Sequence, residues 1–447
     1  MKYSFLIFFI IFYFSYSIEI NIFHGDKIFN KNTPIILNLL SQDTNEQKSN
    51  VDLICIIDIS GSMNGNKILL VKESLKKLIS LMTDKDRISI VLFNHQSFKI
   101  LDLTYTTSSN KIEIINKINN IKAGGGTIII NGLQCAIDIL KVEQMNNKNN
   151  EEYKKRIPSL ILLSDGNDNN MNEIQLSENL KEITKNLNLF FTLHTFGYGN
   201  DHDPKIMNKL ANIRDGSFYY VSEFNKVKDY FINVLGGCMS VISNYVIINV
   251  NSNFTLKKVF GEDDMYSYNF NGNHFDTQIL QFISGKEYTY VFEIDLPDFI
   301  KDGEKILDVE IKYVDNNNNK EVVEKKDFYY QNKFEVVILE KANEEYIRSM
   351  TYEIMKDAMN YKEKNQVDEA KNILNKMKNW LSSNYKGKEN YKDEIDSSIN
   401  LIEDDNLYNV EGRATFFADI REGQRKYGGS KLRFSNALQR SLIRKVI

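Results

Sequence analysis

Cysteine is scarce in this chain, which has three in 447 residues, at positions 55, 135 and 238. Three thiols cannot form a disulfide scaffold or a cysteine-rich zinc site. We expect Cys55 and Cys135 to be core residues, because one falls in an apolar run and the other on a predicted helix. The five histidines form no His-Glu-x-x-His pattern, so the commonest sequence signal of a zinc hydrolase is missing.

An excess of basic residues is missing as well. The chain has 56 Lys and Arg residues against 60 Asp and Glu residues, a net charge of −4, so nothing indicates nucleic acid as a partner. A Gly-x-Ser-x-Gly elbow is absent, and Gly124-Gly125-Gly126-Thr127 lacks the lysine of a phosphate-binding loop. No pair of carboxylates stands out as a general acid and base. We therefore expect no enzymatic activity.

The first 17 residues have the pattern of a secretory signal peptide. Lys2 precedes an apolar run over residues 5–14, and small residues stand at Ser15 and Ser17, before a cleavage site after Ser17. The run is shorter than the roughly 20 residues of a membrane span, and no later stretch is apolar enough. We expect a secreted or secretory-lumenal protein without a transmembrane span once the signal is removed. An uncleaved anchor is the alternative.

Strands and helices alternate along residues 50–237, from the apolar run at 51–57 to a closing helix over 224–235. Such alternation predicts a doubly wound α/β domain, Rossmann-like, with a mostly parallel sheet covered by helices on both faces. The uninterrupted apolar character of the first run is typical of a strand buried on both sides.

The flanking segments have different patterns. Residues 240–333 contain strands in which apolar and charged residues alternate, which predicts a β-sandwich domain. Residues 18–46 hold two strand-like pieces, and we expect them to pair with that β domain. Residues 336–384 carry two apolar helical stripes and predict a helical hairpin. Residues 385–447 are charged and poor in apolar residues, so we expect a partly ordered tail.

The strand predicted at 51–57 runs directly into a loop rich in oxygen side chains. Asp58, Ser60 and Ser62 alternate along this loop, and Gly61 allows it to turn back over the strand end. The pentapeptide taken alone is equally an ordinary Asx or serine turn whose hydroxyls cap the next helix.

Two further oxygen side chains arrive at the ends of other predicted elements. Thr127 follows the glycine run 124–126, and Asp165 follows the strand predicted at 160–163. Sites in open parallel α/β sheets form at the carboxyl ends of the strands. Hard cations such as Mg²⁺ take about six oxygen ligands, and hydroxyls and carboxylates suit them. The combined pattern predicts a cation site.

Three segments together resemble the von Willebrand factor A family: Cys55-Ile56-Ile57-Asp58-Ile59-Ser60-Gly61-Ser62-Met63, Gly124-Gly125-Gly126-Thr127 and Leu162-Leu163-Ser164-Asp165-Gly166. The metal-ion-dependent adhesion site of that family has such a serine loop, a threonine after a glycine-rich turn and an aspartate that ends a later strand. The resemblance implies an intact site of this kind.

The resemblance also implies a role for each ligand. Ser60, Ser62 and Thr127 would coordinate the ion through their hydroxyls, and Asp58 and Asp165 would act directly or through water. The ion would be Mg²⁺, or else Mn²⁺ or Ca²⁺. One coordination position would stay open for a carboxylate of a protein partner.

A further segment, Phe196-Gly197-Tyr198-Gly199-Asn200-Asp201-His202-Asp203-Pro204, resembles one subgroup of this family. That subgroup includes plant zinc-finger proteins with an A domain and A-domain proteins fused to Hint domains, and its layout also continues into β and helical regions. Asp201, His202 and Asp203 suggest a second metal, but the favoured interpretation is that they shape a turn and cap the helix at Pro204. The chain lacks a RING finger and a Hint-like region, so neither ubiquitin ligation nor self-splicing is supported.

Two functional hypotheses follow from these patterns. The first is a secreted or lumenal, non-enzymatic binding or adhesion protein, whose divalent cation engages an acidic group of a protein partner. The alternative is an intracellular or peripheral scaffold protein, in which the metal is structural.

Overall fold

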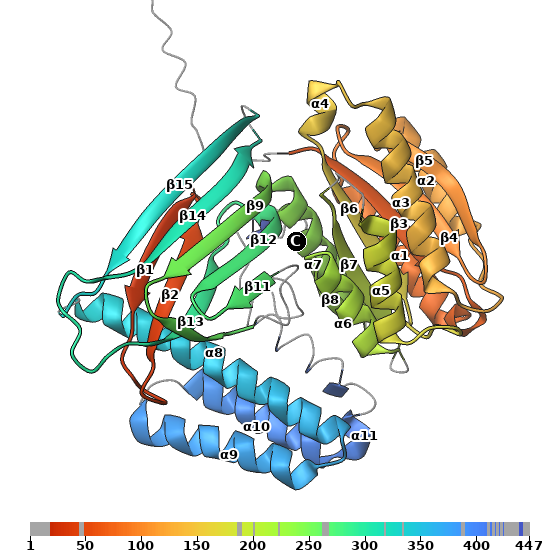
Figure 1. Ribbon diagram of the computed structural model, residues 1–447. Helices are drawn as coiled ribbons and strands as arrows, with labels where there is room; N and C mark the ends of the chain where they lie inside the picture. Colours follow the sequence, from red (N-terminus) through yellow and green to blue (C-terminus); the bar gives the residue numbers. More distant parts are fainter. Residues whose placement is uncertain are drawn as a thin grey trace, which may run out of the picture.

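The computed structural model describes most of the chain: residues 18–43, 49–185, 190–199, 202–221, 224–261, 268–316, 319–332, 335–385, 389–408 and isolated positions between 412 and 440. The predicted signal peptide lies outside these residues. Figure 1 shows three units, namely an α/β unit, a pair of antiparallel sheets and a layer of helices. Within this described part, none of the helices combines the length and the apolar character that a membrane crossing requires.

A six-stranded sheet forms the centre of the α/β unit. Its strands lie in the order β5-β4-β3-β6-β7-β8 and are parallel except at one edge, where β5 pairs antiparallel with β4. The bounds are β3 (Val51–Asp58), β4 (Arg87–Phe93), β5 (Ser97–Tyr105), β6 (Ile157–Ser164), β7 (Thr192–Tyr198) and β8 (Phe218–Val221).

Helices cover both faces of this sheet. One face packs against α1 (Asn66–Leu81), α2 (Ser108–Asn119) and α7 (Phe224–Met239). The other face packs against α3 (Ile129–Asn146), α5 (Glu173–Thr184) and α6 (Pro204–Ile213), and the short elements are η1 (Gly61–Met63) and α4 (Glu151–Lys154). The predicted doubly wound α/β fold is confirmed.

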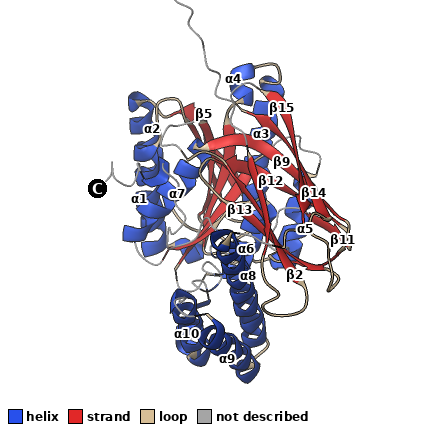
Figure 2. Ribbon diagram, turned by 90° about the vertical axis from the view of Figure 1, so that its left-hand side faces the viewer, coloured by secondary structure: helices blue, strands red, loops and turns tan. Residues whose placement is uncertain are grey.

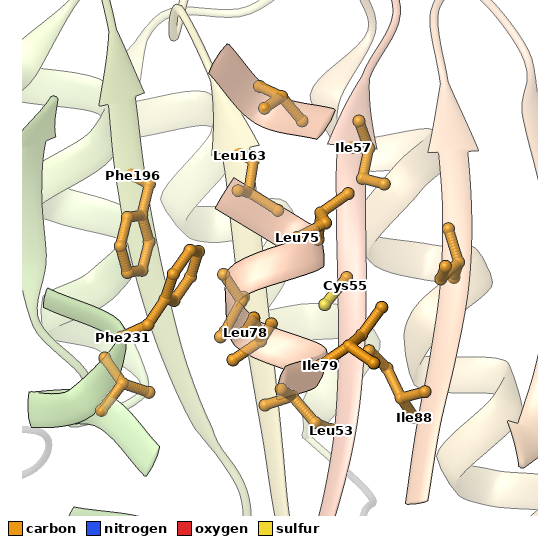
Figure 3. Close-up of a cluster of buried hydrophobic side chains, with 14 of the residues drawn as sticks. Leu53, Cys55, Ile57, Leu75, Leu78, Ile79, Ile88, Leu163, Phe196 and Phe231 are labelled. Carbon is orange, nitrogen blue, oxygen red and sulfur yellow. The ribbon is translucent and has the colours of Figure 1, made fainter. Parts of the chain in front are cut away.

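The central strand β3 explains the apolar run in the sequence. Its side chains alternate between the two faces, with Leu53, Cys55 and Ile57 on one side and Ile54 and Ile56 on the other. Figure 3 shows the first three beside leucine and isoleucine side chains of α1. Because both sides are buried, no polar alternation is needed along the strand. Cys55 is a buried free thiol, as expected of a small core residue.

Two antiparallel sheets, built from strands before and after the α/β unit in sequence, enclose a separate apolar core. One sheet has the order β1-β2-β13-β10, with bounds β1 (Glu19–His24), β2 (Thr33–Leu40), β13 (Tyr288–Asp295) and β10 (Thr255–Val259). The other has the order β11-β12-β9-β14-β15, with bounds β11 (Tyr268–Asn271), β12 (His274–Ile283), β9 (Val241–Ser252), β14 (Lys305–Asp315) and β15 (Lys320–Tyr329). The two N-terminal strands therefore join strands that lie beyond the α/β unit in sequence.

The C-terminal helices are more extensive than the sequence pattern indicated. The elements are α8 (Val336–Glu363), α9 (Val367–Asn384), α10 (Glu389–Glu403) and α11 (Asp405–Leu407). Figure 2 shows α8, α9 and α10 together beside the sheets. Within the segment expected to be a charged, partly ordered tail, a third helix packs through Tyr391, Ile395 and Ile402. The apolar face of this helix is narrow and most of its other residues are charged or polar. The average composition of the segment therefore did not indicate a packed helix.

The last described residues return to the α/β unit. Leu438 joins the core formed by α1, α7 and the sheet, and the side-chain amide of Gln439 donates to the backbone oxygen of Asn233 in α7 at 2.6 Å. This part of the predicted tail is therefore packed against the fold.

Candidate metal centre

Strand β3 ends at Asp58, whose carboxylate is fully buried. Its Oδ1 accepts a hydrogen bond from the backbone N–H of Ser60 at 2.8 Å, and its Oδ2 accepts one from the Ser164 hydroxyl at 2.6 Å. Burial raises the pKa of Asp58 to about 6, against the opposing effect of these donors, and the charge of Asp165 adds to the rise. A cation beside this carboxylate would stabilise its charged form.

The loop after β3 brings the hydroxyl groups of Ser60 and Ser62 into contact. The Oγ atoms of Ser60 and Ser62 lie 3.0 Å apart. Ser60 is buried under the loop, whereas Ser62 is exposed to solvent. Ser60 therefore lies beside the buried carboxylate of Asp58, and Ser62 lies at the protein surface.

The glycine-rich turn before Thr127 lies directly against this serine loop. The backbone N–H of Gly61 donates to the carbonyl of Gly125 at 2.8 Å, and that of Gly124 donates to the carbonyl of Ile59 at 2.6 Å. Gly125 has a φ of +97°, which favours glycine at this position. These two hydrogen bonds hold the first and second ligand-bearing loops together.

Thr127 lies two residues before the start of α3, which begins at Ile129. Its backbone N–H donates to Oδ1 of Asn169, and its carbonyl accepts from the Asn169 N–H at 2.9 Å. The neighbouring Asp168 accepts from the N–H of Ile129 at 2.6 Å. The loop after β6 is thereby joined to the loop that carries Thr127.

Asp165 follows β6 directly and is fully buried. Its Oδ2 accepts a hydrogen bond from Nζ of Lys67 at 3.1 Å, and its Oδ1 accepts a long one from the N–H of Asn167 at 3.4 Å. The backbone oxygen of Asp165 accepts from the N–H of Asp203 at 2.9 Å, which anchors this loop to the start of α6.

The five sequence-predicted ligands thus come from three loops that contact one another at the carboxyl edge of the sheet. They offer two carboxylates and three hydroxyls, the hard oxygen donors that Mg²⁺, Mn²⁺ and Ca²⁺ prefer. Nowhere in the described residues do three or more His, Cys, Asp or Glu side chains group as a metal site. The donor set at this edge fits a hard divalent cation.

Sequence reasoning missed two residues that contact the predicted ligands. Ser164 donates to Asp58, and Lys67 pairs with Asp165. Ser164 stands inside the quoted Leu-Leu-Ser-Asp-Gly segment, so its position next to Asp165 was a usable signal. Lys67 carried no such signal, because it lies 98 residues from Asp165 in sequence.

The second segment of the resemblance has a structural role. The Asp203 side chain accepts hydrogen bonds from the N–H groups of Lys205 and Ile206, at 2.9 and 3.3 Å, and so caps α6. The His202 ring is buried and stacks on Tyr220 with a centroid distance of 4.9 Å. Asp201 lies outside the described residues. The capping interpretation of Asp203 is confirmed.

Residues 52–232 match the sequence profile of the von Willebrand factor type A domain. The chain therefore contains such a domain, a type that typically mediates protein–protein interaction or adhesion. The match covers the α/β unit, from the start of β3 to the middle of α7.

Curated relatives are similar in this same region. An uncharacterized protein of Synechocystis sp. is 28% identical over 180 residues, which is 40% of this chain and 39% of the relative. The inter-alpha-trypsin inhibitor heavy chain H2 of Sus scrofa is 31% identical over 169 residues, 37% of this chain and 17% of the relative. The chain thus spans well under half the length of either relative.

Two solved structures are similar over nearly the whole chain. A von Willebrand factor type A protein from Catenulispora acidiphila has a TM-score of 0.63 and 16% identity, and the match covers 87% of this chain and 89% of that one. The ArnB paralog VWA2 from Sulfolobus acidocaldarius has a TM-score of 0.55 and 16% identity, over 91% and 99%. At this identity the similarity shows the fold alone.

Proposed function

We propose that this protein binds other proteins through a divalent cation, Mg²⁺ in the first place, held at the carboxyl edge of the α/β sheet. The carboxylate of Asp58 is the main support for this function, because it is buried among hydroxyl and N–H donors. A buried carboxylate is costly unless a positive charge compensates it. A divalent cation supplies that charge.

Each proposed ligand has a defined part in holding the ion. The hydroxyls of Ser60, Ser62 and Thr127 would bind it directly, and the carboxylates of Asp58 and Asp165 would bind it directly or through water. The bound ion supplies a positive charge at the surface, beside the exposed Ser62. An Asp or Glu side chain of a protein partner would complete the coordination shell.

Thermal unfolding of the full chain tests the cation site. A ligand that binds only the folded state stabilises it by about 2.7 kcal/mol at 100 times its dissociation constant. We expect Mg²⁺ to raise the melting temperature of the wild type above its value in chelator, and Asp58→Ala to abolish this rise. An equal rise in both proteins would refute the site.

Peptide display tests the partner chemistry. We expect the immobilised protein to retain displayed peptides in Mg²⁺ and to release them in chelator, and Asp58→Ala to retain none of them. Retention should also depend on one acidic residue of the peptide and fail when that residue is changed to its amide. Retention that persists in chelator would contradict cation-mediated binding.

We further propose that the protein acts outside the cell or in the secretory lumen, on the evidence of its first 17 residues. N-terminal sequencing of the native protein should begin after Ser17. A native protein that begins at Met1 would favour the alternative function, an intracellular or peripheral scaffold with a structural metal. That alternative also predicts a rise in melting temperature with Mg²⁺ but no cation-dependent retention of acidic peptides.

A further inference from the structure

We propose that Lys67 is an internal counter-ion of the cation site, which neutralises Asp165 in the cation-free protein and yields it to the incoming ion. This inference rests on the proposed function and concerns the same site. Lys67 Nζ lies 3.1 Å from Oδ2 of Asp165, and the side chains are 17% and 0% exposed. An ammonium group at this distance competes directly with a metal ion for the same oxygen.

The position of Lys67 in its helix supports this role. Lys67 is the second residue of α1, and the first turn of that helix contains no acidic residue. A positive charge in the first turn of a helix is unfavourable, because the helix macrodipole places a partial positive charge there. The attraction of the buried Asp165 carboxylate compensates this cost. When a metal ion takes over Asp165, Lys67 loses this attraction, and the free energy of ion binding becomes less favourable by that amount.

The charges of the site indicate what Lys67 does for recognition. Among three groups of the site, namely the ionised carboxylates of Asp58 and Asp165 and the ammonium of Lys67, the formal charge is −1. A divalent ion changes this to +1, which attracts one carboxylate, whereas a monovalent ion brings it only to zero. Among these three groups, Lys67 thus supplies the positive charge that makes the sum favourable to an acidic partner once a divalent ion is bound.

Calorimetric titration of the metal-stripped full chain with MgCl₂ tests the proposal. Removal of a positive charge a few ångströms from the ion should lower the Mg²⁺ dissociation constant of Lys67→Met by roughly tenfold or more relative to wild type. Lys67→Arg keeps the charge and should stay within about threefold of wild type. The matched control is Lys76→Met, because Lys76 lies on the same helix and pairs with Glu73 at 2.7 Å; its dissociation constant should not change.

The melting temperature in chelator gives a second readout. Lys67→Met should melt below wild type, because Asp165 loses its ammonium partner, and Mg²⁺ should raise its melting temperature by more than it raises that of wild type. Equal Mg²⁺ dissociation constants for wild type and Lys67→Met would overturn the role of Lys67 and leave the cation site standing. An absence of Mg²⁺ binding in all four proteins would overturn the site and the counter-ion together.

Discussion

Strand β3 carries a buried aspartate near each end, and the hydrogen-bond donors around the two carboxylates differ in charge. Asp52, at the start, is 2% exposed and receives two guanidinium groups. Arg87 donates to it through Nε at 2.9 Å and Nη2 at 2.6 Å, and Arg156 donates through Nε at 2.6 Å. Asp58, at the other end, is 0% exposed and receives a hydroxyl and a backbone N–H.

The difference separates a structural carboxylate from a candidate ligand. Asp52 has its charge compensated within the protein, and Arg87 extends this network to Glu143 at 3.0 Å. The groups that donate hydrogen bonds to Asp58 are neutral, so these contacts leave the charge of its carboxylate uncompensated. The carboxyl end of a parallel strand is also where binding sites form in open α/β sheets. Under the proposed function, one end of this strand serves stability and the other end serves binding.

The largest expected effect on stability is at Asp52, whose charge is compensated by two arginines. Asp52→Ala would leave Arg156, whose side chain is 5% exposed, without its carboxylate, and should lower the free energy of unfolding by about 3–5 kcal/mol. Urea unfolding in Mg²⁺ and in chelator should give the same loss. A loss that appears in only one of the two conditions would break the division between the ends.

An intermediate effect on stability is expected at Ser164, whose hydroxyl orients the carboxylate of Asp58. Its hydroxyl donates to Asp58 and accepts from the N–H of Gly166 at 2.9 Å. Ser164→Ala should cost about 1–3 kcal/mol of unfolding free energy in chelator and weaken Mg²⁺ binding by about 10- to 100-fold. Urea unfolding and calorimetric titration measure the two effects. Unchanged Mg²⁺ affinity would show that the orientation of Asp58 is not needed.

The smallest effect on stability is expected at Ser62. This side chain is exposed and contacts the hydroxyl of Ser60. Ser62→Ala should change the unfolding free energy in chelator by no more than about 0.5 kcal/mol, while it reduces the rise in melting temperature that Mg²⁺ produces. If Mg²⁺ raised the melting temperature of this variant as much as that of wild type, Ser62 would be excluded as a ligand.

Local patterns predicted the α/β fold class because they repeat along the chain. The apolar run at 51–57 and the helical stripe after it follow from burial on both faces of β3 and on one face of α1. The α10 helix was missed, because its buried apolar side chains, Tyr391, Ile395 and Ile402, stand among many charged and polar residues. Helix α5 was missed too, since its buried apolar stripe is short.

The candidate site was predicted only as far as its residues mark strand ends. Asp58 and Asp165 each follow an apolar strand, so their positions could be derived from the sequence. The place of Ser164 beside Asp165 was visible in the sequence, but its hydrogen bond to Asp58 spans 106 residues and could not be derived from it. The contact of Lys67 with Asp165, across 98 residues, carried no sequence signal. Such contacts depend on how the strands and helices pack, which no local pattern contains.

Calorimetric titration of metal-stripped wild type and Asp58→Ala with MgCl₂ measures directly whether the carboxylate of Asp58 holds the ion. We expect saturable binding of about one Mg²⁺ per wild-type chain, since the three loops contribute to one proposed site, and no binding to a folded Asp58→Ala variant. Saturable binding of equal affinity to both proteins would contradict the account, because the uncompensated carboxylate of β3 would then have no part in holding the ion.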